Sequence, residues 1–325
     1  MSDEASRREH YSQKRLNQLR LRMKNMSELR RFPELTIFGA GSYARLEASQ
    51  HSDIDMFFLN ASSEADLLEP RTSQLRLFAR VIDIVGKMDF PKFSNDGEYL
   101  KILHMGDMVE QLGGRKDDYD NHFTTRMLLL LESQYLCRPD LYNKAISRII
   151  QSYFRDYPRH RSDFKPIFLV NDIMRYWKTL CLNYENKRLR KTSDKYAVVT
   201  RRVRNFKLKI SRMTTCFATI ALLGCRMKAI SEQVVEEIVR LTPRQRLLSI
   251  PEHLSESKAT IDEILLLYGW FLEMTALSTN QLERHFTDQK KREKAFRRAN
   301  DFGNKMFELL KIVDKKHRIL RYLVI

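Results

Sequence analysis

The sequence predicts an α+β fold, in which a small α/β module with a mixed sheet precedes a large all-α region. Short apolar runs with strand character occur in the first third of the chain, at residues 35–38, 55–59 and 98–105. From residue 121 onward, apolar residues repeat with almost only helical spacing. Glycines are scarce there, because only Gly224, Gly269 and Gly303 lie beyond residue 120.

Each element follows from its local pattern. Leucines and methionines at helical spacing predict a helix over residues 10–31, which Pro33 ends. A strand, a Gly-Ser turn and a second strand follow, then a helix over 70–88 and a strand over 98–105 after an Asn-Asp-Gly turn. The further predicted helices are 122–137, 139–154, 166–188, 196–224, 231–240, 243–250, 258–278 and 280–313. We therefore predict an N-terminal basic helix at 1–32, an α/β module at 33–118 and a helical domain at 119–325.

The composition indicates a polyanionic partner. The chain of 325 residues carries 58 Lys and Arg against 41 Asp and Glu, a formal net charge of +17. This excess favours nucleic acid, a nucleotide or an acidic protein surface as partner, although part of it can simply serve solubility.

The cysteine spacing and the apolar runs bear on zinc binding, secretion and membrane insertion. The four cysteines are widely spaced, without a Cys-x-x-Cys pair or a histidine cluster, which favours reduced, buried thiols and no structural zinc. The N-terminus lacks the apolar stretch of a signal peptide, and the apolar run at 215–225 is too short to span a bilayer. We expect a cytoplasmic protein with no membrane partner.

The segment 35–59 carries the functional signal. An apolar strand leads into Gly41-Ser42, and Asp53-Ile54-Asp55 opens the next strand. Side chains alternate along a strand, so Asp53 and Asp55 are expected on one side, with Ile54 in the core. Two carboxylates on one edge suit Mg²⁺, and a glycine turn lets backbone N–H groups approach phosphates.

The segment from Gly41 to Asp55 resembles the DNA polymerase β-like nucleotidyltransferase superfamily. It is most similar to the bacterial branch of nitrogen-signalling uridylyltransferases and glutamine synthetase adenylyltransferases. Residues 123–133 and 205–209 are weaker echoes of that branch, although Ser211-Arg212-Met213 replaces a Gly-Gly that usually follows there.

The resemblance implies a nucleotidyltransferase with Mg²⁺ or Mn²⁺ held by Asp53 and Asp55. Transfer requires two or three carboxylates that converge on one point. In the family the third comes from a later strand, and Glu98 is the first choice here, ahead of Asp96 in its Asn-Asp-Gly turn.

Triphosphate contacts are expected from four residues. Gly41 and Ser42 would approach the phosphates through the turn, and Ser42 can equally cap the following helix. Arg45 could reach a phosphate or pair with Glu47 or Asp53. Lys178 resembles the basic residue with which related enzymes grip the triphosphate, or is a solvated lysine.

The stretch 187–212 is a second basic signal. It holds eleven Lys or Arg and one acid, with Tyr196 and Phe206 interleaved. Such a pattern can bind phosphates and stack bases, or form one exposed helix face. The candidate nucleic-acid or triphosphate contacts are Arg201, Arg202, Arg204, Lys207 and Lys209.

The leading prediction is transfer of a nucleoside monophosphate from a nucleoside triphosphate onto a protein hydroxyl or an RNA acceptor. Two alternatives stay open: a degenerate fold that binds nucleotides or nucleic acid without chemistry, and a synthase of cyclic or oligomeric nucleotides. The convergence of a third carboxylate would separate the first alternative from the enzyme.

Overall fold

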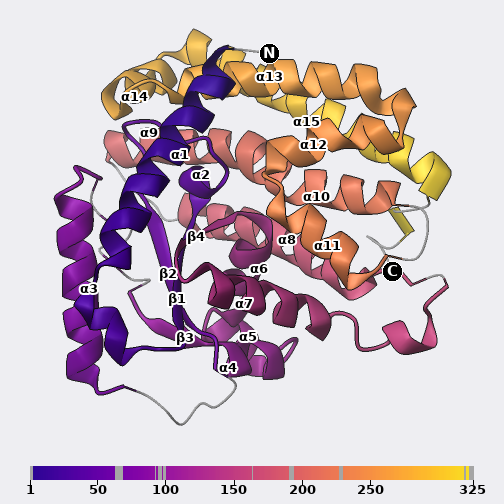
Figure 1. The fold of residues 1–325 in the computed structure, drawn as a ribbon. Helices are drawn as coiled ribbons and strands as arrows, with labels where there is room; N and C mark the ends of the chain where they lie inside the picture. The colour runs from indigo at the N-terminus through magenta and orange to yellow at the C-terminus, as the bar shows by residue number, and fades with distance from the viewer. Residues whose placement is uncertain are drawn as a thin grey trace. The chain divides into compact units, whose positions relative to one another are not determined.

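The computed structural model describes residues 3–62, 69–91, 93, 97, 100–162, 164–189, 194–226, 230–317 and 320–321 (Figure 1). The chain forms two units, Ser6–Arg155 and Asp156–Ile325 together with Met1–Ala5. The predicted boundaries were at residues 32 and 118. The difference arises because the N-terminal helix packs on the sheet and the chain returns to that sheet after residue 132.

A four-stranded mixed sheet forms the centre of the N-terminal unit. Strand β1 (Leu35–Ala40) pairs antiparallel with β2 (Asp55–Asn60) on one side and with β4 (Ser133–Cys137) on the other. Strand β3 (Ile102–His104) runs parallel to β2, which gives the order β3-β2-β1-β4. Every residue of β1 is buried, as expected for a central strand covered on both faces.

Helices cover both faces of this sheet. On one face, α1 (Asp3–Lys24) and α3 (Arg71–Gly86) pack against β1 and β2 through a shared apolar cluster that includes Leu19, Ile37, Phe58 and Leu77. On the other face, Phe38 and Phe57 stack with ring centroids 5.3 Å apart, beside Tyr142 of α7 (Pro139–Ser152). The α+β class with a small mixed sheet is therefore confirmed.

The prediction of one helix over 122–137 was wrong. Helix α6 (His122–Leu131) ends at Glu132, whose φ of −155° leaves the helical region, and the chain continues as β4. The apolar run favours a helix locally. However, β1 has backbone N–H and C=O groups along its second edge, and residues 133–137 pair with them as a strand.

A buried ion pair joins α5 (Arg115–Tyr119) to α6. Arg126 donates to both oxygens of Asp117, at 2.8 and 2.9 Å, and to the hydroxyl of Tyr153 at 2.9 Å. Burial disfavours the guanidinium charge, but the bonds to Asp117 and Tyr153 outweigh it and raise the pKa of Arg126.

The other short elements of this unit are η1 (Ser27–Arg31), α2 (Gly41–Ala44) and α4 (Met105–Glu110).

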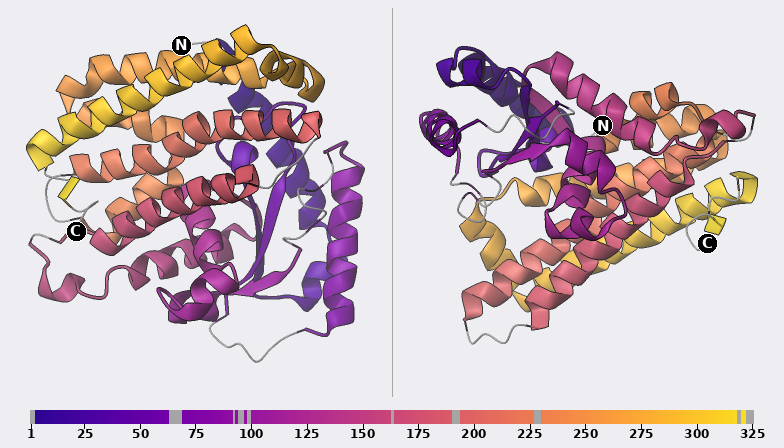
Figure 2. Two further views of the ribbon diagram at one scale, coloured as in Figure 1. Left: turned by 180° about the vertical axis from the view of Figure 1, so that it is seen from behind. Right: turned by 90° about the horizontal axis from the view of Figure 1, so that it is seen from below.

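The described part of the C-terminal unit is helical (Figure 2). Helix α10 (Met213–Cys225) is its core element and contacts α8, α11, α12 and α15. Its Thr219 accepts a hydrogen bond at 2.8 Å from the fully buried Arg246. The helices around it are α8 (Ile167–Leu189), α9 (Lys195–Lys207), α11 (Glu232–Arg240), α12 (Pro243–His253), α13 (Lys258–Thr275), α14 (Thr279–Thr287) and α15 (Gln289–His317), with short turns η3 (Tyr157–Arg159) and η5 (Ser255–Ser257).

Two predicted helices are interrupted. A π-helical turn, η4 (Leu208–Arg212), separates α9 from α10, and Asp288 separates α14 from α15 by accepting from the backbone N–H of Lys291 at 2.9 Å. The stretch Tyr196–Cys225 is long and apolar enough to cross a membrane, yet 67% of its most apolar window is buried inside the fold. It therefore has the properties of a core helix.

The cysteines differ in burial, which generates the first prediction. Cys137, Cys216 and Cys225 are buried, and Cys181 is half-buried. Burial raises the pKa of Cys137 to about 11 and that of Cys216 to about 12, so few thiolates form at these positions. In a reaction of the native protein with an aromatic disulfide reagent at pH 8, we expect one fast phase, from Cys181. The variant Cys181→Ser should lose that phase, and a fast phase that persists in it would contradict the assignment.

Candidate active site

The turn after β1 brings the chain back toward its own strand. Gly41 has a φ of +72°, and the backbone N–H of Glu47 donates to the carbonyl of Ser42 at 2.8 Å. Leu46 also adopts a positive φ, of 59°, which is uncommon for a residue with a branched side chain. The turn thus uses two left-handed positions within six residues, of which only the first carries a glycine.

The acid edge, defined here as Asp53 and Asp55, lies against this turn. Antiparallel pairing sets Ala40 opposite Asp55, so the residue after β1 meets the first residue of β2. A Cβ placed on Gly41 would lie 3.0 Å from Oδ2 of Asp55, which is tighter than nine in ten real Cβ contacts. The glycine is therefore required for two reasons, its backbone conformation and the carboxylate beside it.

Asp53 precedes the strand and is held by its loop. Both acids are half-buried, and Ile54 between them is only 1% exposed, as the alternation predicted. The backbone N–H of Ser49 donates to the hydroxyl of Ser52 at 3.0 Å, and the N–H of His51 donates to the hydroxyl of Ser49 at 3.2 Å. These bonds shape the connection that leads into Asp53.

Arg45 forms a buried ion-pair network behind the turn. Its Nε lies 2.9 Å from Glu47, its Nη1 donates to Glu132, and all three side chains are buried. The predicted pairing with Glu47 is confirmed. Its contact with a phosphate stays a prediction, and the guanidinium already joins two carboxylates in this structure.

Helix α1 holds the same loop from the other side. Arg8 donates to the carbonyl of Glu47 at 2.7 Å, and the hydroxyl of Ser12 accepts from the N–H of Ala48 at 3.0 Å. Arg8 and Ser12 are buried. The sequence analysis missed Glu132, Arg8 and Ser12, and the signal that could have found Glu132 is a lone acid directly after the apolar run 127–131.

The predicted sources of a third carboxylate are not among the residues that the structure describes. Glu98 and Asp96 lie outside the described residues. Within the described ranges, no group of three or more His, Cys, Asp or Glu residues could hold a metal ion. Asp53 and Asp55 are thus the two described side chains that a metal at this edge would use. Their roles in metal binding and in catalysis stay predictions.

The remaining predicted contacts lie in the C-terminal unit. Lys178 is exposed on α8, and its role toward a triphosphate stays a prediction. Arg201 donates to the carbonyls of Lys187 and Arg188, whereas Arg202 donates to that of Phe286. The other three are Lys209, which donates to Asn300 at 2.9 Å, and the exposed Arg204 and Lys207.

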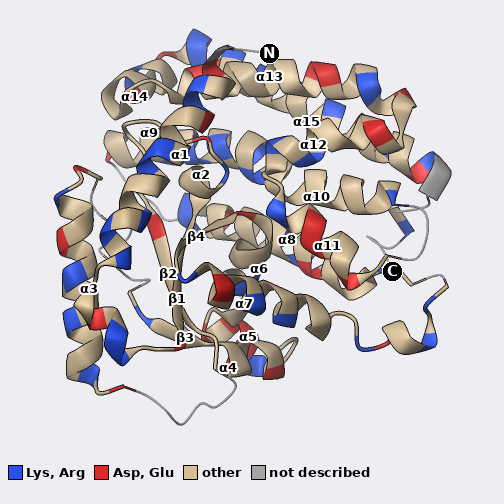
Figure 3. Cartoon of the chain, in the orientation of Figure 1, with Lys and Arg blue, Asp and Glu red and all other residues tan. Residues whose placement is uncertain are grey.

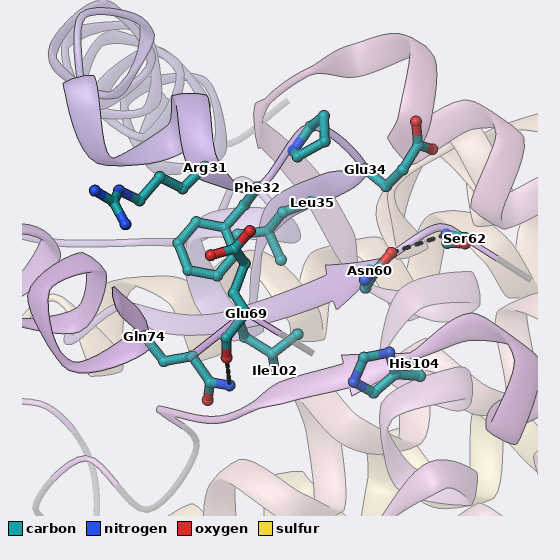
Figure 4. Close-up of a pocket in the computed structure, with 11 residues that line it drawn as sticks. Arg31, Phe32, Glu34, Leu35, Asn60, Ser62, Glu69, Gln74, Ile102 and His104 are labelled. Carbon is teal, nitrogen blue, oxygen red and sulfur yellow. Dashed lines mark hydrogen bonds between the residues drawn. The ribbon is translucent and has the colours of Figure 1, made fainter. Parts of the chain in front are cut away.

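A cavity of about 150 Å³ lies at the opposite end of the strands (Figure 4). Leu35 at the start of β1, Asn60 at the end of β2 and His104 at the end of β3 line it. In antiparallel β1 and β2, Leu35 and Asn60 are each five positions away from Ala40 and Asp55. This cavity is therefore separate from the acid edge.

Comparison with known proteins adds no relative. No family model matches the chain, no curated protein matches it, and no solved structure matches it. The resemblance of residues 41–55 to nucleotidyltransferases therefore stays a prediction from the sequence.

The Arg45 network generates the second prediction. Breaking a buried ion pair leaves one charge without its partner, so Glu132→Gln should lower the free energy of unfolding by about 3–5 kcal/mol. Arg45→Lys should also destabilise, because an ammonium cannot bridge two carboxylates in the geometry of a guanidinium. Urea unfolding measures both effects.

A matched control is Glu185→Gln, which removes an exposed pair with Arg188 at 2.7 Å. Solvent screens such pairs, so its unfolding midpoint should stay unchanged. Equal stability of Glu132→Gln and wild type would show that the buried network does not hold the turn.

Proposed function

We propose that the N-terminal unit transfers a nucleoside monophosphate from a nucleoside triphosphate to an acceptor hydroxyl, with Mg²⁺ or Mn²⁺ held by Asp53 and Asp55. The observation that carries this proposal is the contact between the glycine turn and the second acid. A Cβ placed on Gly41 would lie only 3.0 Å from Oδ2 of Asp55, so the turn and this carboxylate are in close contact. Turn and carboxylate therefore converge on one point at the end of two paired strands.

The two acids fit a divalent cation. Mg²⁺ is commonly bound by one or two carboxylates, with substrate phosphates and water in the other positions. When bound, the metal would activate the acceptor oxygen and neutralise charge on the pyrophosphate. A third carboxylate would complete a two-metal arrangement, and Glu98 is the proposed source.

The residues of this chain have separate tasks in the proposed reaction. The acceptor oxygen attacks the α-phosphorus, the bond to the bridging oxygen breaks, pyrophosphate leaves, and the acceptor proton passes to solvent or a nearby base. Asp53 and Asp55 bind the cation, and the turn at Gly41 and Ser42 approaches the phosphates. Arg45 keeps the intervening loop in place through its two carboxylates.

The acceptor is either a protein hydroxyl or RNA. The resemblance of residues 41–55 favours a protein side chain, and the net charge of +17 favours RNA. A nucleotide-binding module without turnover is the second candidate, and the convergence of a third carboxylate with Asp53 and Asp55 would separate it from the enzyme.

The third prediction concerns the acids. Asp53→Asn and Asp55→Asn are nearly isosteric but weaken a metal site, so each should reduce transfer by at least about 100-fold. The measurement incubates protein with each α-labelled nucleoside triphosphate, Mg²⁺ or Mn²⁺, and a mixture of cell protein and RNA. Label in protein or RNA supports the transferase, and label in small nucleotides alone would support a synthase.

Two controls accompany that assay, folding by circular dichroism and binding of the nucleoside triphosphate. If both variants fold and their turnover is unchanged, the acid edge is excluded as the site. Binding of triphosphate by the wild type without label in any product would support the module without chemistry.

The fourth prediction separates conformation from contact at Gly41. Gly113 has a similar φ of +75°, but a Cβ on it would meet nothing within 4 Å. Gly41→Ala and Gly113→Ala should each cost about 1–2 kcal/mol of stability through the left-handed backbone. Only Gly41→Ala also displaces Asp55, so we expect it to lose transfer and Gly113→Ala to keep it. Equal activity of the two variants would contradict the proposed contact.

A further inference from the structure

The C-terminal end of α8 and helix α9 form a basic surface, which is named here the α8–α9 ridge. Its members are Lys187 and Arg188 on α8 and Tyr196, Arg201, Arg204 and Lys207 on α9. Arg201 joins the two helices, because its Nη1 donates to the carbonyl of Lys187 at 3.3 Å and to that of Arg188 at 2.9 Å. Two segments that are separate in sequence therefore present one set of cations.

Cations outnumber acids in the described segments that form this ridge. Residues 184–189 and 194–207 contain seven Lys or Arg and two acids. Both acids are engaged, since Glu185 pairs with Arg188 at 2.7 Å and Asp194 caps α9 by accepting from the N–H of Tyr196 at 2.8 Å. The ridge therefore favours a partner that brings several negative charges.

An aromatic ring lies among these cations. Tyr196 is 60% exposed, and Arg204 and Lys207 are also exposed. Residues at i, i+8 and i+11 lie on one face of an α-helix, so these three side chains project together. Phe206, the other aromatic residue of this stretch, is fully buried against Trp270, Phe271 and Phe286 and is excluded from such a role.

We propose that the α8–α9 ridge binds single-stranded RNA, with its Lys and Arg side chains on backbone phosphates and Tyr196 stacked on a base. Cations in a row contact successive phosphates, and an exposed ring gives a sequence-tolerant stacking platform. An acidic protein would match the charge but would make no use of the ring. Lys and Arg also occur on α1 and α3, so net charge alone predicts no preference for this ridge (Figure 3).

The test is fluorescence anisotropy of a 20-nucleotide RNA of mixed sequence, labelled with fluorescein, between 50 and 300 mM KCl. The triple variant Lys187→Ala, Arg204→Ala, Lys207→Ala should weaken binding at least about 10-fold at 100 mM salt. It should also lower the slope of log affinity against log salt by about 2, because each phosphate contact on a single strand contributes roughly 0.7. Arg201 is left intact, because it connects α8 with α9.

The matched charge control is Arg76→Ala, Arg80→Ala, Lys87→Ala, on α3 and at the residue directly after it, where the three side chains are exposed and the charge loss is the same. It should stay within about 2-fold of the wild type. Tyr196→Ala should weaken binding about 5- to 10-fold, whereas Tyr196→Phe keeps the ring and should match the wild type.

Three results would overturn the proposal: no RNA binding at 50 mM salt, equal losses in both triple variants, or polyglutamate competing as well as RNA at equal charge. Preferential binding to anionic phospholipid vesicles would overturn it as well. The vesicle measurement is included because Leu182 and Leu189 are exposed on α8. The inference does not depend on transfer chemistry. Asp53→Asn should bind the same RNA with unchanged affinity, so the two proposals fail separately.

Discussion

The position of the acid edge depends on one buried guanidinium. Arg45 is only 8% exposed, and a charge at such a depth is tolerated only when it is paired. Its partners come from two places in the chain, Glu47 in the loop that leads to Asp53 and Glu132 at the start of β4. Because both carboxylates must stay close to it, the loop cannot move away from the sheet without leaving a buried charge uncompensated. Arg8 and Ser12 of α1 add hydrogen bonds to the same loop and reinforce that restraint.

Buried arginines perform a comparable task elsewhere in both units. Arg126 joins α5 to α6 through Asp117, and Arg246 joins α12 to the carbonyl of Ile238 and to Thr219 of α10. Both side chains are fully buried. A guanidinium has five donors in a rigid plane, so it can satisfy several acceptors from different elements at once. Part of the positive charge therefore has a structural use, and the exposed part can act on partners. Lys187, Arg204 and Lys207 of the α8–α9 ridge belong to that exposed part.

Several features of the fold and the candidate site could be predicted from sequence. Local signals were sufficient for the strands at 35–38 and 55–59, the helix at 70–88 and the burial of Ile54, since each follows from alternation or helical spacing. Strand β4 could not be predicted, because residues 133–137 gain their hydrogen bonds from the distant β1. The role of Glu132 was hidden for the same reason, as its partner Arg45 is 87 positions away. The stacking role considered for Phe206 failed because helical periodicity did not reveal which face of α9 is covered by α14 and the rings around it.

Local patterns in the sequence specify the groups that are available: a glycine turn, two acids at alternating positions and an excess of cations. Residue type and spacing are local properties, and they specify which groups a short segment presents. Which of these groups meet depends on the fold. It set Gly41 against Asp55 through strand register and enclosed Arg45 between two carboxylates. It also left Arg204, Lys207 and Tyr196 on one open helix face. The physical reason is that burial and pairing depend on contacts between distant segments, whose free energies no local pattern records.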